Sequence, residues 1–356
     1  HSGEYLYPPV ADEADIAELR RRLRGAGLTP SSLPLGVDID KWLDGGQTTW
    51  DAYPDTCGGK MDAETCGLAT ALAYKNVTLE TGWSVTKMRC DQNGHIKEVV
   101  CDNNGRLQTL SAPLIVLAAG AVQSAALLLA SASDRYPNGL ANGSDQVGRN
   151  FMNHNCSAVL ALHPLRRNRA VYQKTVMVND FYLHKQHELP LGNVQMLGKI
   201  TGDILTASSA LPRWLAGIIA ARSFDFYAMS EDLPNPDSRV TLHNGVIKLD
   251  WQRSNWEAHK QLVKKLKQAL RRAGFPIVLS QPFDRRTPSH QCGTARMGND
   301  PASSVVDSYC RSHDHANLFI VDASVLPTSA AVNPALTIAA LALRAGRHIR
   351  EIQWSH

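Results

Sequence analysis

The sequence lacks the short motifs by which several enzyme classes are recognised. Its 356 residues contain no P-loop, no serine-elbow motif and no His or Cys set at zinc-ligand spacing. They also contain no G-x-G-x-x-G, the glycine fingerprint with which a Rossmann unit binds a dinucleotide. The sequence therefore predicts no bound metal. It also argues against a P-loop hydrolase, an elbow-type serine hydrolase and a self-contained NAD-dependent dehydrogenase.

Long apolar runs and a strong charge bias are absent as well. The most apolar window, 114–132, includes Gly120, Gln123 and Ser124, so it fits a strand and a helix better than a membrane span of about 20 residues. The net charge is only +4, and the single basic run, 20–24, favours a solvated helix face over a nucleic-acid surface. No signal peptide is visible, and a cytoplasmic or periplasmic location is favoured.

The composition is that of an ordinary globular protein. With 44% hydrophobic and 20% charged residues, the chain is long enough for two domains or for one domain with two lobes. The seven cysteines are odd in number and widely spaced, which argues against a disulfide framework. We therefore expect most of them to be buried thiols.

Hydrophobic periodicity divides the first part of the chain into short helix and strand patterns. Leu19 and Leu23 fall at helical spacing, and the residues NNG at 103–105 are typical of a hairpin turn. The expected elements are a helix over 11–27, a surface connection over 28–56, a helix over 62–75, a strand, a break and a strand over 76–91, a hairpin that turns at 103–105, and a fully buried strand over 114–117.

The middle of the chain, 151–286, has a different pattern. Short strands with partial alternation are separated by turns, which predicts an antiparallel sheet, and 255–273 predicts an amphipathic helix ended by Gly274. Several aromatic side chains in this range could stack on a sugar ring, although packing in the core is the favoured interpretation. They are Tyr172, Phe181, Phe224, Phe226 and Tyr227.

The strand predicted at 114–117 runs directly into AAGAVQSAALLLAS. A strand that ends in small residues and turns into a helix can place backbone amides against a bound cofactor, because the helix N-terminus carries a partial positive charge. The same pattern also makes a tight packing turn between a strand and a helix. Both interpretations stay open from the residues alone.

Two polar residues stand out in the apolar stretch from Thr287 to Thr337. His290 lies in the loop SHQCGTARMG, and a neutral imidazole there could accept a proton near neutral pH. Asn333 precedes Pro334 and a long apolar helix, a position at which capping of the helix is the simple interpretation. Taken singly, His290 is more often a structural histidine, and neither residue identifies an enzyme.

The residues around these two resemble a known signature. HQCGTARMGNDPASSVVDSYCRSHDHANLFIVDASVLPTSAAVNPALTIAALALRAGRHI is similar to the C-terminal signature of the glucose-methanol-choline (GMC) flavoprotein oxidoreductases. LIVLAAGAVQSAALLLAS, LPNPDSRVTL and NVTLETGWSVTKM resemble further segments of the same family. The AVNPALT form is similar to the pyranose oxidase, choline oxidase and cholesterol oxidase branches.

The resemblance implies a function and a set of site residues. It implies FAD as the cofactor and oxidation of the CH-OH group of a sugar or alcohol, with His290 as the base and Asn333 as a hydrogen-bond donor to the same oxygen. The electron acceptor is left open. The cofactor contacts that it implies are Val85, Ala119, Gly120, Asp322, Ala323, Pro334, Leu336 and Thr337.

The resemblance also implies an architecture. We expect an α/β fold in which a partial FAD-binding, Rossmann-like domain is interrupted by an α+β substrate lobe with an antiparallel sheet. The expected division is a helix and connecting segment over 1–50, FAD-domain parts over 51–150 and 287–356, and the substrate domain over 151–286.

One feature departs from the family pattern. GMC proteins open with a G-x-G-x-x-G unit, which this sequence lacks. A truncated chain, a processed chain and a split enzyme would each explain the departure, and we expect a second polypeptide to supply the segment. Alone, the chain is expected to bind FAD poorly or not at all. The alternative function is that of a non-catalytic binding or assembly subunit which keeps the fold without flavin.

Overall fold

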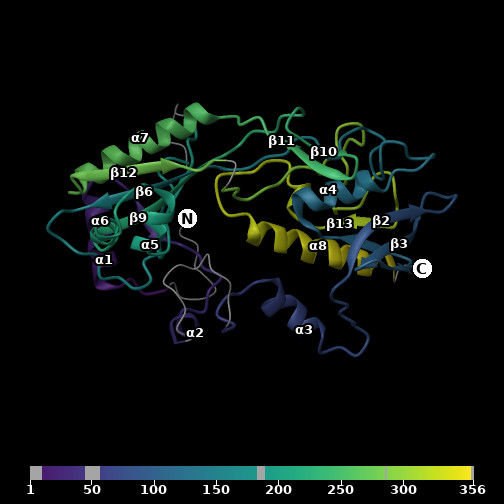
Figure 1. The fold of residues 1–356 in the computed structure, drawn as a ribbon, viewed down its shortest axis with the longest axis horizontal. Coiled ribbons are helices and arrows are strands. Elements are labelled where there is room, and N and C mark those ends of the chain that lie inside the picture. Colours follow the sequence, from purple (N-terminus) through teal and green to yellow (C-terminus); the bar gives the residue numbers. More distant parts are fainter. Residues whose placement is uncertain (1–9, 45–56, 183–188, 285–286, 354–356) are drawn as a thin grey trace. The chain divides into compact units, whose positions relative to one another are not determined.

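The computed structural model describes residues 10–44, 57–182, 189–284 and 287–353, and they divide into two packing units. One unit combines His1–Leu79, Cys156–Ser230 and Glu257–Phe283, and the other combines Glu80–Asn155, Glu231–Trp256 and Asp284–His356 (Figure 1). The sequence-based division differs from these units at two segments. It places 51–79 with the FAD-domain parts and 231–256 with the substrate domain, whereas the packing units assign 51–79 to the first unit and 231–256 to the second. Within the described residues, no helix has the length and apolar character needed to cross a bilayer.

The first unit is built on an antiparallel sheet, as predicted for the middle of the chain. The strand order is β1-β7-β8-β9-β6-β12, and the pairings of β1 with β7, β7 with β8, β8 with β9 and β6 with β12 are antiparallel. The strands are β1 (Pro30–Ser32), β6 (Asn155–Leu162), β7 (Val176–Val178), β8 (Asn193–Met196), β9 (Ser223–Ser230) and β12 (Ile277–Pro282).

Two amphipathic helices close the core of this unit. Helix α1 (Ala14–Gly25) buries Leu19 and Leu23, and α7 (Trp256–Arg272) buries Leu262 and Leu266, in one cluster with the sheet. Gly274 follows α7 with φ +89°, as expected of a glycine that ends a helix. The shorter helices of the unit are α2 (Ile39–Asp44), the π-helical turn η1 (Glu64–Leu68), α3 (Ala69–Ala71), α5 (Gly202–Ser208) and α6 (Arg213–Ala220).

The five aromatic residues singled out in the sequence pack in the core of this unit. Tyr172, Phe226 and Tyr227 are buried, and Phe181 and Phe224 lie against the main hydrophobic cluster. The packing interpretation of these side chains is therefore confirmed.

The second unit contains three small sheets. β2 (Ser84–Cys90), β3 (Ile96–Asn103) and β4 (Arg106–Leu110) form an antiparallel meander, β10 (Arg239–His243) pairs with β11 (Val246–Asp250), and β5 (Ile115–Leu117) pairs in parallel with β13 (Leu318–Ile320). Asn104 and Gly105 turn the β3–β4 hairpin with φ of +51° and +88°, as a type I′ turn requires. The helices are α4 (Gly120–Ala130), the 3-10 turn η2 (Ala323–Val325) and α8 (Ala335–Gln353).

Two local predictions were wrong, and a third was confirmed only in part. Residues 76–83 form no strand. The helix expected over 62–75 is reduced to η1 and α3, because neither of these turns buries a residue and Gly67 lies within the first of them. The strand β5 is not fully buried either, since 48% of Val116 is exposed. Residues 45–56, within the predicted surface connection, lie outside the described part of the chain.

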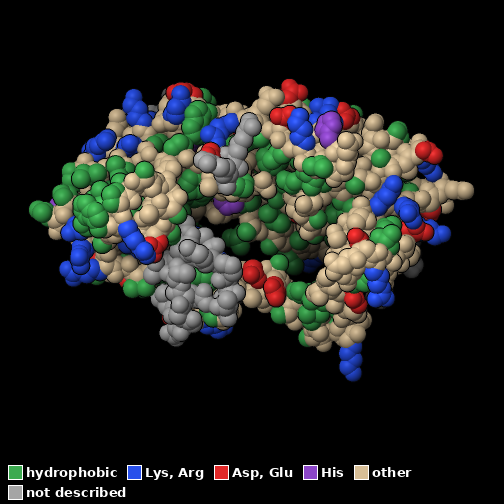
Figure 2. Space-filling view, in the orientation of Figure 1, with side chains coloured by type: hydrophobic (Ala, Val, Ile, Leu, Met, Phe, Trp, Pro, Cys, Tyr) green, Lys and Arg blue, Asp and Glu red, His purple; other side chains and the backbone are tan. Residues whose placement is uncertain are grey.

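Three large apolar side chains of the second unit are exposed. Parallel strands are normally covered on both faces, yet Val116 of β5 is exposed, and Leu336 and Leu343 of α8 are 76% and 77% exposed. Figure 2 shows hydrophobic side chains, in green, in several patches of the molecular surface. Val116, Leu336 and Leu343 are referred to below as the apolar surface of the second unit.

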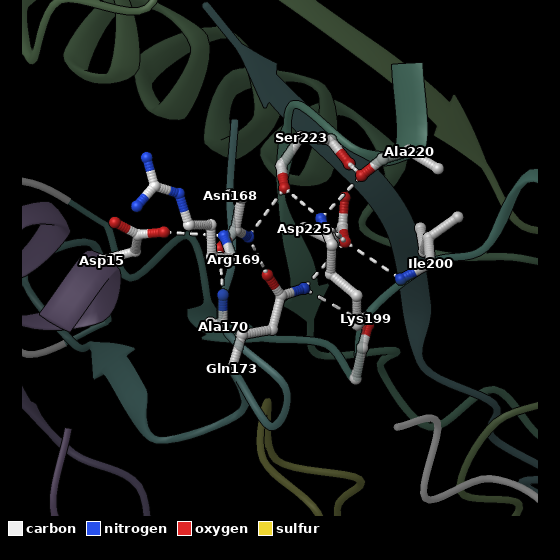
Figure 3. Close-up of polar contacts among 11 residues, drawn as sticks. Asp15, Asn168, Arg169, Ala170, Gln173, Lys199, Ile200, Ala220, Ser223 and Asp225 are labelled. Carbon is white, nitrogen blue, oxygen red and sulfur yellow. Dashed lines mark hydrogen bonds and ion pairs between the residues drawn. The ribbon is translucent and has the colours of Figure 1, made fainter. Parts of the chain in front are cut away.

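A buried polar network crosses the sheet of the first unit (Figure 3). The Asp225 carboxylate accepts hydrogen bonds from Gln173 Nε2 at 2.7 Å and from the Ile200 amide at 3.0 Å. Lys199 Nζ lies 3.9 Å from Asp225 Oδ2 and donates to the carbonyl oxygens of Ala220 and Ser223. Burial raises the pKa of Asp225, and the Lys199 charge opposes that rise. The Lys199 ammonium therefore offsets part of the free-energy cost of burying the Asp225 carboxylate.

Replacing Lys199 by Met should lower the free energy of unfolding by about 3–5 kcal/mol at neutral pH, because it leaves a buried carboxylate without its cation. The loss should shrink as the pH falls towards about 4. A carboxyl whose folded pKa is raised binds more protons when folded, so the stability present at low pH is lost as pH rises. Urea unfolding of the chain at several pH values, followed by circular dichroism, measures both effects.

The matched control is Lys199→Met combined with Asp225→Asn, which removes both charges and should recover most of the loss. A deficit of the same size at every pH, shared by the double variant, would show that Lys199 contributes through packing alone.

Candidate active site

His290 is positioned by two chain segments that pair with each other. Met152 and Cys292 exchange both backbone hydrogen bonds at 3.0 Å, and the Ser289 amide donates to Asn153 Oδ1 at 2.7 Å. Segments 150–154 and 289–293 therefore lie side by side although they are far apart in sequence. His290 itself has φ +59°, a left-handed conformation that is uncommon outside glycine.

Gly293 is required by this pairing. Its φ is +93°, and a Cβ at this position would lie 2.3 Å from the carbonyl oxygen of Asn150. Only glycine combines that dihedral angle with so close an approach of two backbones. The glycine of the His-x-x-Gly pattern therefore sets the path of the loop that presents His290.

The structure brings the two predicted catalytic residues together. His290 is half-buried, and its Nε2 lies 3.2 Å from Nδ2 of the exposed Asn333, just before α8. The Nδ1 atom lies 3.0 Å from His154 Nδ1 and 3.2 Å from Ser289 Oγ. His290 therefore uses one ring nitrogen towards Asn333 and the other towards the interior.

His154 is a residue of this site that was not predicted from the sequence. This side chain is 2% exposed, and its ring stands edge-on to that of His290 at a centroid distance of 4.8 Å. Its Nε2 lies 2.7 Å from the carbonyl oxygen of Ser329. Burial lowers the pKa of His154, and the Ser329 carbonyl and the Asp232 charge only partly oppose this. The signal available in the sequence was a second histidine, in QVGRNFMNH, next to the start of β6.

Asp232 was also missed, and it holds the surroundings of His154 together. Its Oδ2 accepts from the Asn153 amide at 3.0 Å and from Trp251 Nε1 at 2.8 Å, while its Oδ1 accepts from the amide and hydroxyl of Ser254. Its backbone exchanges hydrogen bonds with Ser329 Oγ in both directions at 3.0 Å. Asp232 thus links the segment that carries His154, through its carboxylate, to Ser329, through its backbone.

The cysteine beside His290 is not a nucleophile. Burial raises the pKa of Cys292 to about 12, and the charges of Asp232 and Glu231 add to the rise. A thiol is nucleophilic only as a thiolate, so Cys292 is inert near neutral pH. Cys292 thus differs from the low-pKa thiol that a cysteine–histidine hydrolase requires, despite the sequence His-Gln-Cys.

The backbone amides at the turn between β5 and α4 are hydrogen-bonded to side chains of the same unit. Asp322 accepts hydrogen bonds from the Gly120 amide at 3.0 Å, from Ser124 Oγ, and from the Ser324 amide at 2.7 Å, while the Ala119 amide donates to Ser124 Oγ at 3.1 Å. The anion at this helix N-terminus is thus Asp322 itself. Gly120, with φ +83°, still borders open space, since a Cβ there would meet no atom within 4 Å.

The remaining residues predicted to contact a cofactor lie at accessible positions of the second unit. Pro334, Leu336 and Thr337 form the start of α8, where Leu336 and Thr337 are exposed. Val85 is half-exposed on β2, an edge strand of its sheet, and Ala323 begins η2 beside the cluster of Met152, Cys292 and Leu326. The first turn of α8 offers backbone amides and a partial positive charge to an anionic group.

Two family profiles match this chain, over residues 39–156 and 234–342, and both describe a GMC oxidoreductase. The chain belongs to the GMC oxidoreductase family. Members of this family are FAD-dependent flavoproteins. The second match includes His290 and Asn333, and the first includes Val85, Gly120 and His154. The sequence-based assignment of family, fold and cofactor class is therefore confirmed, while the roles of individual residues stay predictions.

Known GMC proteins match most of the chain. Paromamine 6′-oxidase from Streptomyces fradiae is 28% identical over 96% of this chain and 65% of its own length. The fructose dehydrogenase large subunit from Gluconobacter japonicus is 29% identical over 83% of this chain and 60% of its own length. The crystal structure of pyridoxine 4-oxidase from Mesorbium loti superposes with a TM-score of 0.62 at 19% identity, covering 97% of this chain and 71% of that one. The chain thus spans less than two thirds of the length of paromamine 6′-oxidase and of the fructose dehydrogenase large subunit.

Two places in the second unit have features suited to the cofactor of GMC proteins. Gly120 leaves open space beside the backbone of the β5–α4 turn, and the accessible first turn of α8 offers amide donors. Pro334, Leu336 and Thr337 could hold the flavin ring end, where a partial positive charge favours the anionic reduced form. The carboxylate of Asp322 is engaged by Gly120, Ser124 and Ser324, so a contact from this residue would come from its backbone.

Replacing Gly293 by Ala should lower the free energy of unfolding by about 2 kcal/mol or more, because a left-handed φ and a backbone clash act together. The matched control is Gly105→Ala. Gly105 has φ +88° but open space around it, so this change should cost only about 1 kcal/mol. Chemical denaturation of both variants gives the comparison. Equal losses would mean that segment 289–293 can move away from Asn150 at little cost.

Proposed function

We propose that this chain forms the substrate side of an FAD-dependent enzyme that oxidises the CH-OH group of a sugar or alcohol to a carbonyl. The observation that supports it best is the pair of His290 Nε2 and Asn333 Nδ2, 3.2 Å apart at the N-terminal end of α8. An imidazole nitrogen and an amide N–H so placed can bind one hydroxyl group, the first as proton acceptor and the second as donor to its oxygen. The names of the relatives, which include paromamine and fructose, favour a sugar or sugar-like substrate.

In this proposal the residues have separate roles. The substrate O–H bond breaks and its proton passes to His290 Nε2, while the Asn333 amide stabilises the negative charge that grows on the oxygen. Bound FAD supplies the acceptor for the hydride that leaves the same carbon, so the alcohol loses one proton and one hydride and becomes a carbonyl.

We further propose that a separate polypeptide segment, which carries G-x-G-x-x-G, completes the cofactor site. These 356 residues lack that fingerprint, and paromamine 6′-oxidase has room for it because only 65% of its length is matched. The apolar surface of the second unit is suited to such a partner, since Val116, Leu336 and Leu343 would leave water on packing. The alternative function is a binding or assembly subunit that keeps this fold without flavin.

Replacing His290 by Ala should reduce the rate of flavin reduction at least about a hundredfold in the FAD-loaded protein, because the base is lost. Stopped-flow absorbance with a sugar or alcohol substrate measures this rate. The control is His243→Ala, which removes an exposed histidine at the end of β10 and should leave the rate unchanged. Wild-type reduction by a folded His290→Ala protein would remove His290 from the chemistry.

Replacing Leu343 by Asp should lower FAD content when the chain is produced together with the G-x-G-x-x-G segment, because a charge would be buried in the proposed contact. The control is Leu165→Asp, at a residue of the first unit that is 89% exposed. The flavin absorbance at about 450 nm relative to protein gives the FAD content. Protein that stays colourless and inactive with both FAD and the segment would instead support the assembly-subunit alternative.

A further inference from the structure

The Ser329 carbonyl determines which nitrogen of His154 carries a proton. A carbonyl oxygen can only accept a hydrogen bond, and it lies 2.7 Å from His154 Nε2. The His154 ring must therefore be protonated at Nε2. The position of Ser329 is fixed by its hydroxyl, which accepts a hydrogen bond from the Asp232 amide and donates one to the Asp232 carbonyl oxygen.

The other nitrogen of His154 is then an acceptor. The ring is 2% exposed, and burial lowers its pKa, so the neutral form prevails near neutral pH. A neutral imidazole has a single N–H, which leaves a lone pair on Nδ1. The charged group that acts on this ring is Asp232, whose carboxylate is already occupied by the donors of Asn153, Trp251 and Ser254.

This lone pair in turn selects the tautomer of His290. The two Nδ1 atoms are 3.0 Å apart, a distance at which two lone pairs would repel and an N–H must lie between them. His290 Nδ1 is therefore the donor, and the Ser289 hydroxyl at 3.2 Å can share it as a second acceptor. Neutral His290 then carries its lone pair on Nε2, where the Asn333 amide nitrogen faces it at 3.2 Å.

We infer that His154 is a positioning residue, which holds His290 in the one neutral tautomer whose Nε2 can accept a proton. The inference rests on the proposed role of His290 as the base. The chain of contacts runs from the Ser329 carbonyl through His154 to His290, and each step is set by what the previous atom can donate or accept. Since the Ser329 carbonyl can only accept a hydrogen bond, this series of contacts orients His290 but does not relay a proton from His290 through His154 to Ser329.

Nitrogen NMR of the histidine rings tests this directly, without flavin or turnover. In the full chain labelled with ¹⁵N-histidine, His290 should show a protonated Nδ1 and an unprotonated Nε2, and His154 the reverse. The resonances are identified by their loss in His290→Ala and His154→Gln. A wild-type His290 with its proton on Nε2 would overturn the inference, whatever the fate of the proposed reaction.

Two substitutions at His154 separate positioning from packing. In His154→Phe an aromatic ring still fills the site, but the Nδ1 acceptor is lost. The population of His290 protonated at Nε2 should therefore increase. Flavin reduction should slow by about tenfold or more, with a small change in KM. In His154→Gln the amide can donate to Ser329 and accept from His290, so both the tautomer and the rate should be largely restored.

Each outcome has a distinct meaning. An unchanged His290 tautomer in folded His154→Phe would refute the positioning role. If His154→Phe does not fold, the wild-type spectrum and His154→Gln still decide. A correct tautomer together with wild-type flavin reduction in His290→Ala would refute the proposed base and leave the orientation by His154 standing.

Discussion

The candidate site depends on the backbone pairing of segments 150–154 and 289–293. The two hydrogen bonds between Met152 and Cys292 fix the spacing, and Gly293 permits it because any side chain would collide with Asn150. Both histidines of the site are carried on these segments. Their rings meet because the two backbones approach so closely, and the left-handed conformation of His290 directs its side chain to that meeting point.

Asp232 has a different part in the same arrangement. A buried carboxylate is tolerated when its oxygens are fully hydrogen-bonded, and here four donors from Asn153, Trp251 and Ser254 surround it. Its backbone also holds Ser329, whose carbonyl orients His154. The chemistry proposed for His290 is thus prepared by groups that lie away from the substrate. Preorganised side chains of this kind are expected where a proton must be accepted without rearrangement.

The second unit contains both an organised site and an apolar surface without a cover among the described residues. β5 pairs with β13, which is also bridged to Arg311, and the apolar side chains of α8 include Leu336 and Leu343 at high exposure. The site itself is nevertheless held by internal contacts such as those of Asp322 with Gly120 and Ser324. The contacts of His290 and Asn333 are therefore made within this unit, whereas the proposed flavin site would be completed by a segment that carries G-x-G-x-x-G.

Local patterns in the sequence determined the family, the antiparallel sheet, the hairpin at Asn104 and Gly105, and the candidates His290 and Asn333, because each depends on neighbouring residues or on a contiguous motif. The tertiary structure alone decided the rest. His154 and Asp232 are far from His290 in sequence, and the histidine in QVGRNFMNH gains a role at the site only when segments 150–154 and 289–293 pair. The exposure of β5 was likewise invisible, since an apolar run does not reveal whether another segment covers it. Which nitrogen of His290 can accept a proton is decided by three groups brought together only by folding.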